Sequence, residues 1–431
     1  MANFPGVAAQ LVLDLNERYY ARTTATSHIV VDKGEGPIVF DQDGNQFIDL
    51  HCDAGVNNLG HCHPHIVETI IDQVKRLIFA EHHNGPNNWA VHLAYQLAVE
   101  GPLAKGTTYP KVFFSNSGTE ANETARKLCR VYRVFKTKEP DRTKAIYFIN
   151  GFAGRTKGSL PATSSKPEVQ RDPFWDHCDK ENTIYLPYPK ERDGWREGKK
   201  IFDEINLSEV DRILMEVPCQ GEAGIIPVGE SALKYICERA QEADVIFISD
   251  CIQTGMGRVG TLFGCDIFKW FRPDILTLGK ALGGGLPIGA TVFRRDLDFP
   301  ELSMHANTFG GHPTIARCAL VALAEYRKII NSGRVEEIAA ILDTRLRELY
   351  KHKFVKDVRG RGAMWGVEFS SAALRDKVIV AGEKLSIVEN YGLRLLGAGQ
   401  KSIRIMPPLI ISDDLLNLAM DLLDKVLKAL G

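Results

Sequence analysis

The stretch DILTLGKALGGGLPIG, from Asp274 to Gly289, holds one lysine between an apolar segment and a glycine-rich one. Residues 275–278 predict a short buried strand, and Lys280 follows almost at once. The glycines at 283–285 allow positive φ angles and a close approach of a ligand to the backbone. An amine held there is partly desolvated, which lowers its pKa and makes it a better nucleophile, as Schiff-base lysines require. A surface lysine before an ordinary loop fits this stretch, taken alone, equally well.

A carboxylate follows the most strand-like run of the chain. Residues 245–249, VIFIS, are apolar on both faces, which predicts a strand of a parallel sheet ending at Asp250. Ligands of α/β sheets bind at the carboxyl ends of the strands, so Asp250 is a candidate ligand-binding residue. The stretch GMGRVG at 255–260 matches the dinucleotide-binding pattern GxGxxG. Because it lies too far past the strand and does not open a helix, we expect no nucleotide there.

A third feature is a small, hydroxyl-rich turn at the start of a predicted helix. Residues 111–114 predict a strand, and the following SNSGTEANE leads into a helix that continues to about Phe135. Free N–H groups and the helix dipole at such a turn can bind a phosphate. An ordinary helix cap built from Ser117 and Glu120 fits the same residues. Phe152, after a predicted strand at 145–150, can stack on a flat ring or belong to the core.

Two further patterns concern charge and metal ligands. Arg404 lies inside an apolar predicted strand at 402–405, so it needs a carboxylate from the protein or from a substrate. His61, His63 and His65 alternate, as metal ligands can. However, Pro64 marks a turn into a helix and no carboxylate cluster joins the histidines in the sequence. We therefore favour a structural turn and expect no metal.

Composition limits the possible partners. The chain has 431 residues with 53 basic and 54 acidic side chains, which gives no reason to expect nucleic acid as a partner. No apolar run approaches the roughly 20 residues that span a bilayer. The first residues lack the pattern of a secretory signal. Nine cysteines without a CxxC pair fit reduced thiols, so we expect a cytoplasmic protein without a membrane partner.

The order of the predicted elements indicates an α/β fold. Residues 33–50 predict a β-hairpin that turns at Asp43-Gly44, and strands and helices then alternate to about residue 310. Residues 160–200 are polar and rich in proline, so we expect a long surface excursion. Long helices with a few strands follow residue 310. We predict a segment 1–60 that joins a small domain, a large domain at 61–310 and a small domain at 311–431.

Motifs along nearly the whole chain resemble those of class III (ω-amino acid type) aminotransferases of pyridoxal 5′-phosphate (PLP) fold type I, a group with acetylornithine, ornithine and 4-aminobutyrate aminotransferases. They are GEGPIVFDQDGNQFIDL, NNLGHCHP, NSGTEANE, NGFAGRTKGSL, VPCQGEAG, ISDCIQTGMGRVG, LGKALGGGLPIGA, NTFGGHP, DVRGRGAMWGVEF and IRIMPPL. The resemblance implies a large domain with a mostly parallel, seven-stranded type of sheet and a smaller α+β domain. It also implies PLP as cofactor and a homodimer or higher homo-oligomer.

The resemblance assigns the cofactor-binding residues. Lys280 would carry PLP as a Schiff base and shuttle a proton, Asp250 would pair with the pyridinium nitrogen, and Gln253 would lie near the 3-hydroxyl of the ring. Phe152 would stack on the ring. The residues implied to hold the phosphate are Ser117, Gly118, Thr119 and, across the dimer interface, Thr308.

The resemblance also assigns substrate contacts. Arg404 is similar to the arginine that binds a substrate α-carboxylate, and Glu222 to the glutamate that masks it when an ω-amino substrate is bound. A permanent salt bridge between the two is the alternative. Ala54 stands where the family often has a larger side chain in the substrate pocket. Three residues beside the cofactor depart from the usual pattern: Ala153, Val217 and Cys251.

The implied activity is transfer of an amino group from an amino acid, of the ornithine, acetylornithine or 4-aminobutyrate type, to 2-oxoglutarate by a ping-pong mechanism. An amino-acid racemase or epimerase on the same scaffold is the alternative, because the altered surroundings of the ring leave it open. A PLP-binding protein without turnover and an oxidoreductase are weaker alternatives. The identity and handedness of the amino donor stay open at this point.

Overall fold

A seven-stranded sheet forms the centre of the larger part of the molecule. The computed structural model describes residues 4–23, 27–104, 110–177 and 179–431, so parts of the predicted N-terminal segment 1–60 lie outside the described residues. In spatial order the strands are β4 (Lys111–Ser115), β12 (Gly289–Phe293), β11 (Ile275–Leu278), β10 (Ile246–Asp250), β7 (Val210–Glu216), β5 (Lys144–Phe148) and β6 (Thr183–Leu186). Only β12 runs antiparallel to its neighbours; the other pairs are parallel. This confirms the predicted α/β fold with a mostly parallel sheet.

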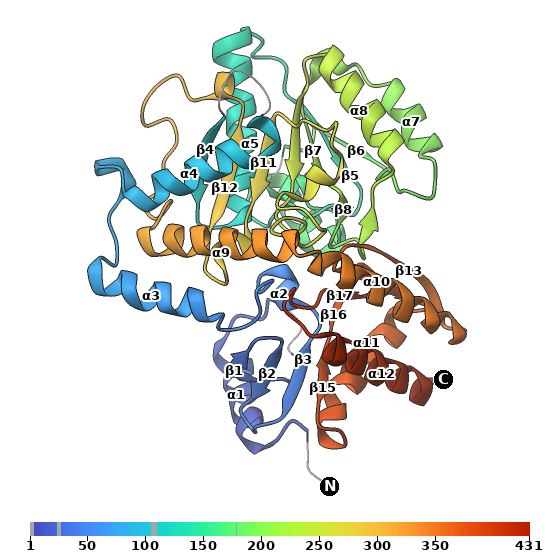
Figure 1. Cartoon of the computed structure of the whole chain (residues 1–431). Helices are drawn as coiled ribbons and strands as arrows, with labels where there is room; N and C mark the ends of the chain where they lie inside the picture. Colours follow the sequence, from blue (N-terminus) through green and yellow to red (C-terminus); the bar gives the residue numbers. More distant parts are fainter. Residues whose placement is uncertain (1–3, 24–26, 105–109, 178) are drawn as a thin grey trace.

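Helices cover this sheet, which explains why its central strands are apolar on both faces. All five residues of β10 and all four of β11 are buried. Buried residues of α5 pack on one face of the sheet with Ile246 and Ile248 of β10, whereas those of α4, α7 and α8 belong to the cluster of Phe247 on the other face. Figure 1 shows α9 crossing below the strands. The helices of this part are α3 (Pro64–Arg76), α4 (Asn88–Glu100), α5 (Gly118–Val131), α6 (Pro167–Gln170), α7 (Arg196–Asp203), α8 (Glu230–Glu242) and α9 (Pro313–Asn331).

The lower part of the molecule in Figure 1 joins residues from both ends of the chain. One sheet has the order β1 (Val31–Glu35), β2 (Ile38–Asp41), β3 (Gln46–Asp49) and β15 (Gly392–Arg394); the other has the order β13 (Val355–Arg361), β14 (Met364–Phe369), β17 (Ser402–Ile405) and β16 (Leu396–Ala398). The helices here are α1 (Val7–Tyr19), α2 (Cys52–Gly55), α10 (Arg334–Arg347), α11 (Ala372–Lys384) and α12 (Asp413–Leu430). Because β3 pairs with β15, the early residues complete a sheet of the C-terminal part. The boundaries at residues 60 and 310 remain predictions.

One structural expectation is wrong. Residues 160–200 are not only a surface excursion, because β6 within them forms the edge of the large sheet, parallel to β5. Its sequence TIYL is itself typical of a strand, with Leu186 buried and the other three residues partly buried, but it lies within polar, proline-rich surroundings. The predicted hairpin at 33–50 is confirmed, with β2 and β3 antiparallel.

Within the described part of the chain, no helix combines the length and the apolar character that crossing a membrane requires.

Candidate active site

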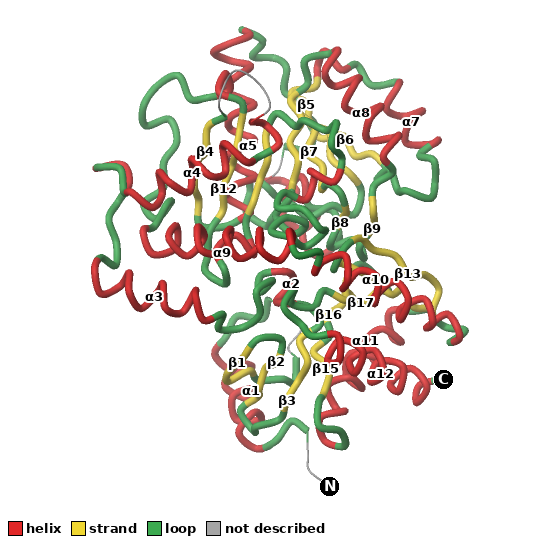
Figure 2. The backbone as a smooth tube through the Cα atoms, viewed as in Figure 1, coloured by secondary structure: helices red, strands yellow, loops and turns green. Residues whose placement is uncertain are grey.

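The carboxyl ends of three neighbouring parallel strands bring the predicted chemistry together. Asp250 ends β10, with Glu216 of β7 opposite it on one side and Thr277 of β11 on the other. Lys280 follows Thr277 by three positions. Figure 2 shows loops gathered at this edge, between the sheet and the lower part of the molecule. The lysine and the acid therefore lie at the same edge of the sheet, as the sequence predicted.

Lys280 stands at the start of a short 3-10 turn, η8 (Lys280–Gly283), with a left-handed φ of 45°. Non-glycine residues in this region cost free energy, and such strain concentrates at functional sites. Burial lowers the pKa of the Lys280 amine, against the opposing charge of Glu222. No carboxylate of the described residues lies within 4.0 Å of the amine. The amine is thus held in a less charged, more nucleophilic state.

Asp250 is 5% exposed and is held by two donors. The Asn122 side chain donates to one carboxylate oxygen at 2.8 Å, and the Ile252 N–H donates to the other at 3.0 Å. Burial raises the pKa of Asp250, and these two hydrogen bonds oppose the shift. No cation of the described residues forms an ion pair with this carboxylate. A protonated ring nitrogen would supply the missing positive charge.

The N-terminus of α5 supplies free backbone donors next to this pair. The Ser117 hydroxyl accepts from the Glu120 N–H at 3.2 Å, so the ordinary helix cap does form. Within the described chain no acceptor meets the N–H groups of Gly118 and Thr119. Gly279, next to Lys280, packs on this end of the helix: a Cβ there would lie 3.3 Å from the Gly118 nitrogen. The helix end can therefore bind an anion beside the lysine.

Phe152 is fixed through its backbone. Its N–H donates at 2.9 Å to one oxygen of Glu216, and the Gly221 N–H donates at 2.9 Å to the other. Burial, together with the neighbouring Asp250, raises the pKa of Glu216 to about 8. Glu216 thus ties the ring-stacking candidate to the segment that carries Glu222.

The buried pair of acids leads to a first prediction. Since the pKa of Glu216 rises from 4.5 to about 8 on folding, the folded chain binds the extra proton between these values. The stability of cofactor-free protein should therefore fall as pH rises through this window, by up to about 1.4 kcal/mol per pH unit. In Glu216→Gln this part of the slope should vanish. Urea unfolding of both proteins at about pH 5 and about pH 8 measures how the free energy of unfolding changes with pH. An equal change in the two proteins would refute the raised pKa of Glu216.

Two of the departures from the family pattern contact each other behind Asp250. The Cys251 thiol donates to the Val217 carbonyl at 3.3 Å, and both residues are buried. Ala153 is also buried; its N–H donates to the Thr163 hydroxyl at 3.1 Å, and its carbonyl accepts from Asn122. Ala153, Val217 and Cys251 are thus all buried near Asp250, which keeps its two donors.

The predicted substrate pair is formed. Arg404 on β17 is 2% exposed and donates to both oxygens of Glu222, at 2.9 and 3.0 Å. It also donates to the Gly397 carbonyl at 3.0 Å. Burial alone would raise the pKa of Glu222, but the charge and hydrogen bonds of Arg404 lower it to about 2. The two groups neutralise each other in this conformation.

Gln253 and Ala54 meet at an unusual turn. The Gln253 side chain is 7% exposed and donates to the Ala54 carbonyl at 2.9 Å. Cys52, Asp53 and Ala54 have φ angles of 48°, 50° and 60°, and we call these three residues the left-handed turn. Left-handed helical geometry costs about 1–2 kcal/mol per non-glycine residue. Gly221 allows the approach of Gln253, because a Cβ there would lie 1.6 Å from its Oε1.

Thr308 takes no part in these contacts and is exposed on the surface. Two residues of the site were not predicted, Asn122 and Glu216. Asn122 follows Gly118 by four positions, so helical spacing puts it on the same face of α5. The register of β7 against β10 places Glu216 beside Asp250, and this register cannot be deduced from the sequence alone.

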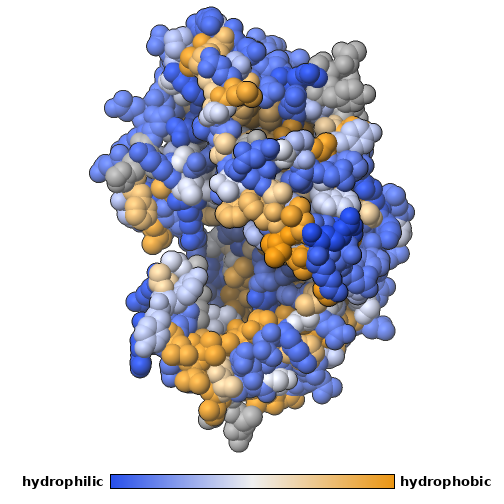
Figure 3. Space-filling view, turned by 90° about the vertical axis from the view of Figure 1, so that its left-hand side faces the viewer, coloured by the Kyte–Doolittle hydropathy of each residue, from blue (hydrophilic) through white to orange (hydrophobic). Residues whose placement is uncertain are grey.

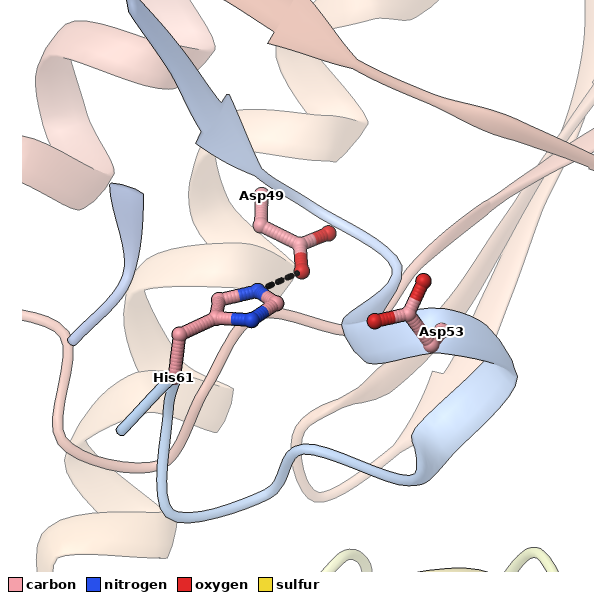
Figure 4. A group of neighbouring side chains, drawn as sticks. All are labelled: Asp49, Asp53 and His61. Carbon is pink, nitrogen blue, oxygen red and sulfur yellow. Dashed lines mark hydrogen bonds and ion pairs between the residues drawn. The ribbon is translucent and has the colours of Figure 1, made fainter. Parts of the chain in front are cut away.

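The rings of His63 and His65 lie 5.4 Å apart, but His61 has other partners. The expectation that no carboxylate cluster joins the histidines is wrong for His61, because Asp49 and Asp53 lie beside it in space. His61 bonds to Asp49 at 2.8 Å, whereas His65 bonds to Glu325 at 2.9 Å. Figure 4 shows His61 beside Asp49, with Asp53 on the following turn; the potential ligand atoms of the three lie within 4.8 Å of one another. Arg394 reaches Asp49 at 3.3 Å and Asp53 at 2.6 Å. A guanidinium thus already supplies the positive charge there, and we propose no metal.

Comparisons with known proteins identify the family of this chain. The family model "Aminotransferase class-III" matches residues 19–427. The acetylornithine aminotransferase of Caldanaerobacter subterraneus subsp. tengcongensis is 34% identical over 417 residues, 96% of this chain and 99% of the relative. That of Aquifex aeolicus is 35% identical over 402 residues, 92% and 96% of the two chains.

Among solved structures, an ornithine aminotransferase from Toxoplasma gondii, described with partial occupancy of PLP at its active site, has a TM-score of 0.84. It is 28% identical and covers 97% of this chain and 94% of its own. The chain belongs to the class III aminotransferases. Enzymes of this class use PLP, and this protein is a PLP-dependent aminotransferase.

Proposed function

We propose that the enzyme moves an amino group from an ω-amino acid, of the ornithine, acetylornithine or 4-aminobutyrate type, to 2-oxoglutarate in two half-reactions at one site. The observation that carries this proposal is the bidentate pair of Arg404 and Glu222 near Lys280. A paired arginine leaves room for an uncharged chain end, and a freed arginine binds a carboxylate. The names of the relatives, acetylornithine and ornithine aminotransferases, support the same class of donor.

The residues at the sheet edge fit PLP. The free N–H groups of Gly118 and Thr119, after Ser117, would hold its phosphate, and Thr308 of a second copy would add a hydroxyl. Asp250 would face the ring nitrogen, where its buried carboxylate gains the cation that it lacks. Phe152 would cover the ring and Gln253 would lie by its hydroxyl group.

The chemistry divides between the cofactor and the chain. When bound, PLP supplies an aldehyde that condenses with amines and a ring that withdraws electrons from the substrate Cα. The Lys280 amine, kept less charged by burial, would take the proton from the substrate Cα and deliver it to C4′, the aldehyde carbon of PLP. Asp250 holds the ring nitrogen charged, and Arg404 orients the oxo acid by its carboxylate.

The test uses purified, PLP-loaded enzyme with single enantiomers of ornithine, N-acetylornithine, 4-aminobutyrate, lysine and alanine, each with and without 2-oxoglutarate. Chiral chromatography follows the products. Glutamate formed only with the oxo acid supports the proposal, and the best donor identifies the substrate. Accumulation of the opposite enantiomer without any oxo acid would instead identify a racemase and overturn the proposal.

Glu222→Gln provides the second prediction within the same assay. In this variant Arg404 no longer has to break an ion pair with residue 222 before it binds 2-oxoglutarate. The KM for 2-oxoglutarate should fall about tenfold, and the preference for donors with an uncharged end should weaken. An unchanged KM would mean that the pair is a permanent salt bridge. Glu230→Gln, which removes an exposed glutamate at the start of α8, is the control.

We further propose a homodimer. Apolar residues four or three positions apart form exposed stripes on three helices: Val7, Leu11 and Leu15 on α1, Val67, Ile71 and Val74 on α3, and Val91, Tyr95 and Val99 on α4. Figure 3 shows apolar side chains around a hollow on the face that carries α3 and α4. Exposed stripes of this kind are typical of interfaces. A one-chain mass in sedimentation at micromolar concentration would contradict the dimer.

The division at residues 60 and 310 is also a proposal, which the pairing of β3 with β15 supports. Limited proteolysis that released fragments elsewhere would contradict it.

A cytoplasmic location is supported by the eight described cysteines, which are all free. Recovery of the enzyme outside the cytoplasmic fraction would contradict that location.

A further inference from the structure

The left-handed turn is held by a cluster of four charged or titratable side chains, Asp49, Asp53, His61 and Arg394, which we call the turn lock. Figure 4 shows the first three of them. Arg394 on β15 lies opposite Asp49 of β3 in the parallel pairing of the two strands. Its guanidinium joins the two carboxylates, at 3.3 Å to Asp49 and 2.6 Å to Asp53. The Arg394 side chain thus connects the two ends of the short segment 49–53.

Asp49 makes most of the contacts within the turn lock. Its side chain is fully buried, and one oxygen accepts the N–H groups of His51 and Cys52, at 3.1 and 3.0 Å. Its other oxygen bonds to His61 at 2.8 Å. Burial alone would raise the pKa of Asp49, but the neighbouring histidines and Arg394 hold it well below its usual range. The buried carboxylate therefore stays charged and fixes the entry to the turn.

The turn itself has no glycine at its three left-handed positions. A sequence of Cys, Asp and Ala would adopt right-handed or extended geometry if left alone. Strained conformations persist only where the surroundings determine them, and they cluster at functional sites. Asp53 is therefore held from both sides, by Arg394 and by the Asn57 amide at 2.7 Å.

The far end of the turn reaches the active site. The Ala54 carbonyl accepts from Gln253, and a Cβ on Gly55 would lie 3.6 Å from the Gln253 Cγ. The Gln253 amide group donates to this carbonyl and also interacts with Glu222, while its Oε1 has no donor among the described residues. The position of the Gln253 amide therefore depends on the Ala54 carbonyl.

We propose that Arg394 is a positioning residue of the active site: by joining Asp49 and Asp53 it holds the left-handed turn, whose Ala54 carbonyl keeps the Gln253 amide in the position that it takes beside the ring hydroxyl of the cofactor. The last step rests on the proposed function, which assigns Gln253 to that hydroxyl. Neither Arg394 nor Asp53 is among the residues that the proposed function assigns to the cofactor. Their effect passes entirely through the turn and Gln253.

The experiment compares Arg394→Met, Gln253→Ala and the double variant in a cycle. The readout is the pH midpoint of the absorbance change of bound PLP, which needs no substrate. Both single variants should shift the midpoint in the same direction, and the double variant should shift it no further than Gln253→Ala alone. Additive shifts, or no shift in Arg394→Met, would overturn the proposal.

Activity gives the second readout. Arg394→Met should lose between about tenfold and about a hundredfold in kcat/KM, as a small misplacement near the chemistry does. Ala54→Gly keeps the carbonyl and relieves the left-handed strain, so adding it to Arg394→Met should restore part of the loss and of the midpoint. Failure of this rescue would argue against the turn as the link.

Two controls separate this role from general stability. Arg345→Met removes an arginine that binds Asn417 at 2.8 Å and also Asp421, and it should leave the midpoint unchanged. If Arg394→Met does not fold, Asp53→Asn replaces it, because the Arg394 contact with Asp49 remains in that variant. An unchanged midpoint in a folded Asp53→Asn would then overturn the proposal. Absence of glutamate formation in the unaltered enzyme would refute the proposed function but not the midpoint cycle.

Discussion

Lys280→Ala should slow amino transfer by at least about a thousandfold. The variant loses the amine that we propose moves the proton at the substrate Cα, and positioned general bases contribute about 10²–10⁴-fold on their own. It also loses the covalent attachment of the cofactor that the family resemblance implies. Single-turnover kinetics with the best donor measures the loss of the proton transfer, and the absorbance of bound PLP reports the attachment.

Several outcomes distinguish this role from a structural one. Since burial opposes the charge of this amine, the apo form of Lys280→Ala should be no less stable to urea than the unaltered enzyme. Small amines added to the buffer should restore part of the rate, because they can enter the space that the side chain leaves. Lys144→Ala, which removes an exposed lysine paired with Glu209, is the control and should keep full activity. Unchanged activity in Lys280→Ala would refute its catalytic assignment.

The parts of the site that the sequence predicted are those with a local signal. Lys280 and Asp250 directly follow apolar strands, and strand ends of a parallel sheet meet at one edge. The N-terminus of α5 has its own cap residues, so its free N–H groups could be expected from nine consecutive residues. The pairing of Arg404 with Glu222 came from the family resemblance, because 182 positions separate them.

The parts that sequence reasoning missed depend on contacts between distant segments. Glu216 is an ordinary strand end until the register of β7 places it beside Asp250. Arg394 contacts Asp49, 345 positions away in the sequence, only because β15 pairs with β3. The left-handed turn could not be expected from Cys, Asp and Ala, which favour other conformations, because its conformation is imposed from outside. Polar contacts of this kind leave no periodic pattern in the sequence.

Asp250→Asn should lower kcat by about 10²–10⁴-fold and weaken PLP binding. The amide keeps the size of the side chain, but it cannot compensate the positive charge of a protonated ring nitrogen. Leaving one member of a buried ion pair without its partner costs about 3–5 kcal/mol, which corresponds to the stated loss in rate. Steady-state kinetics and titration of the apo-enzyme with PLP measure the two effects.

The stability of the apo-enzyme should change in the opposite direction. Burial raises the pKa of Asp250 in the folded chain, so without cofactor this carboxyl stabilises the fold at low pH and loses that contribution as pH rises through its folded pKa. At neutral pH the neutral amide should therefore make apo Asp250→Asn at least as stable to urea as the unaltered apo-enzyme, although the PLP-loaded variant is less stable. Asp274→Asn is the control, because Asp274 is half-buried, has a raised pKa and accepts the Phe247 N–H at 2.7 Å, but it pairs with Arg294 and precedes β11 at the other end of the strand. This control should keep its PLP affinity. A loss of stability in apo Asp250→Asn with unchanged PLP affinity would show that the carboxylate serves the fold and not the cofactor.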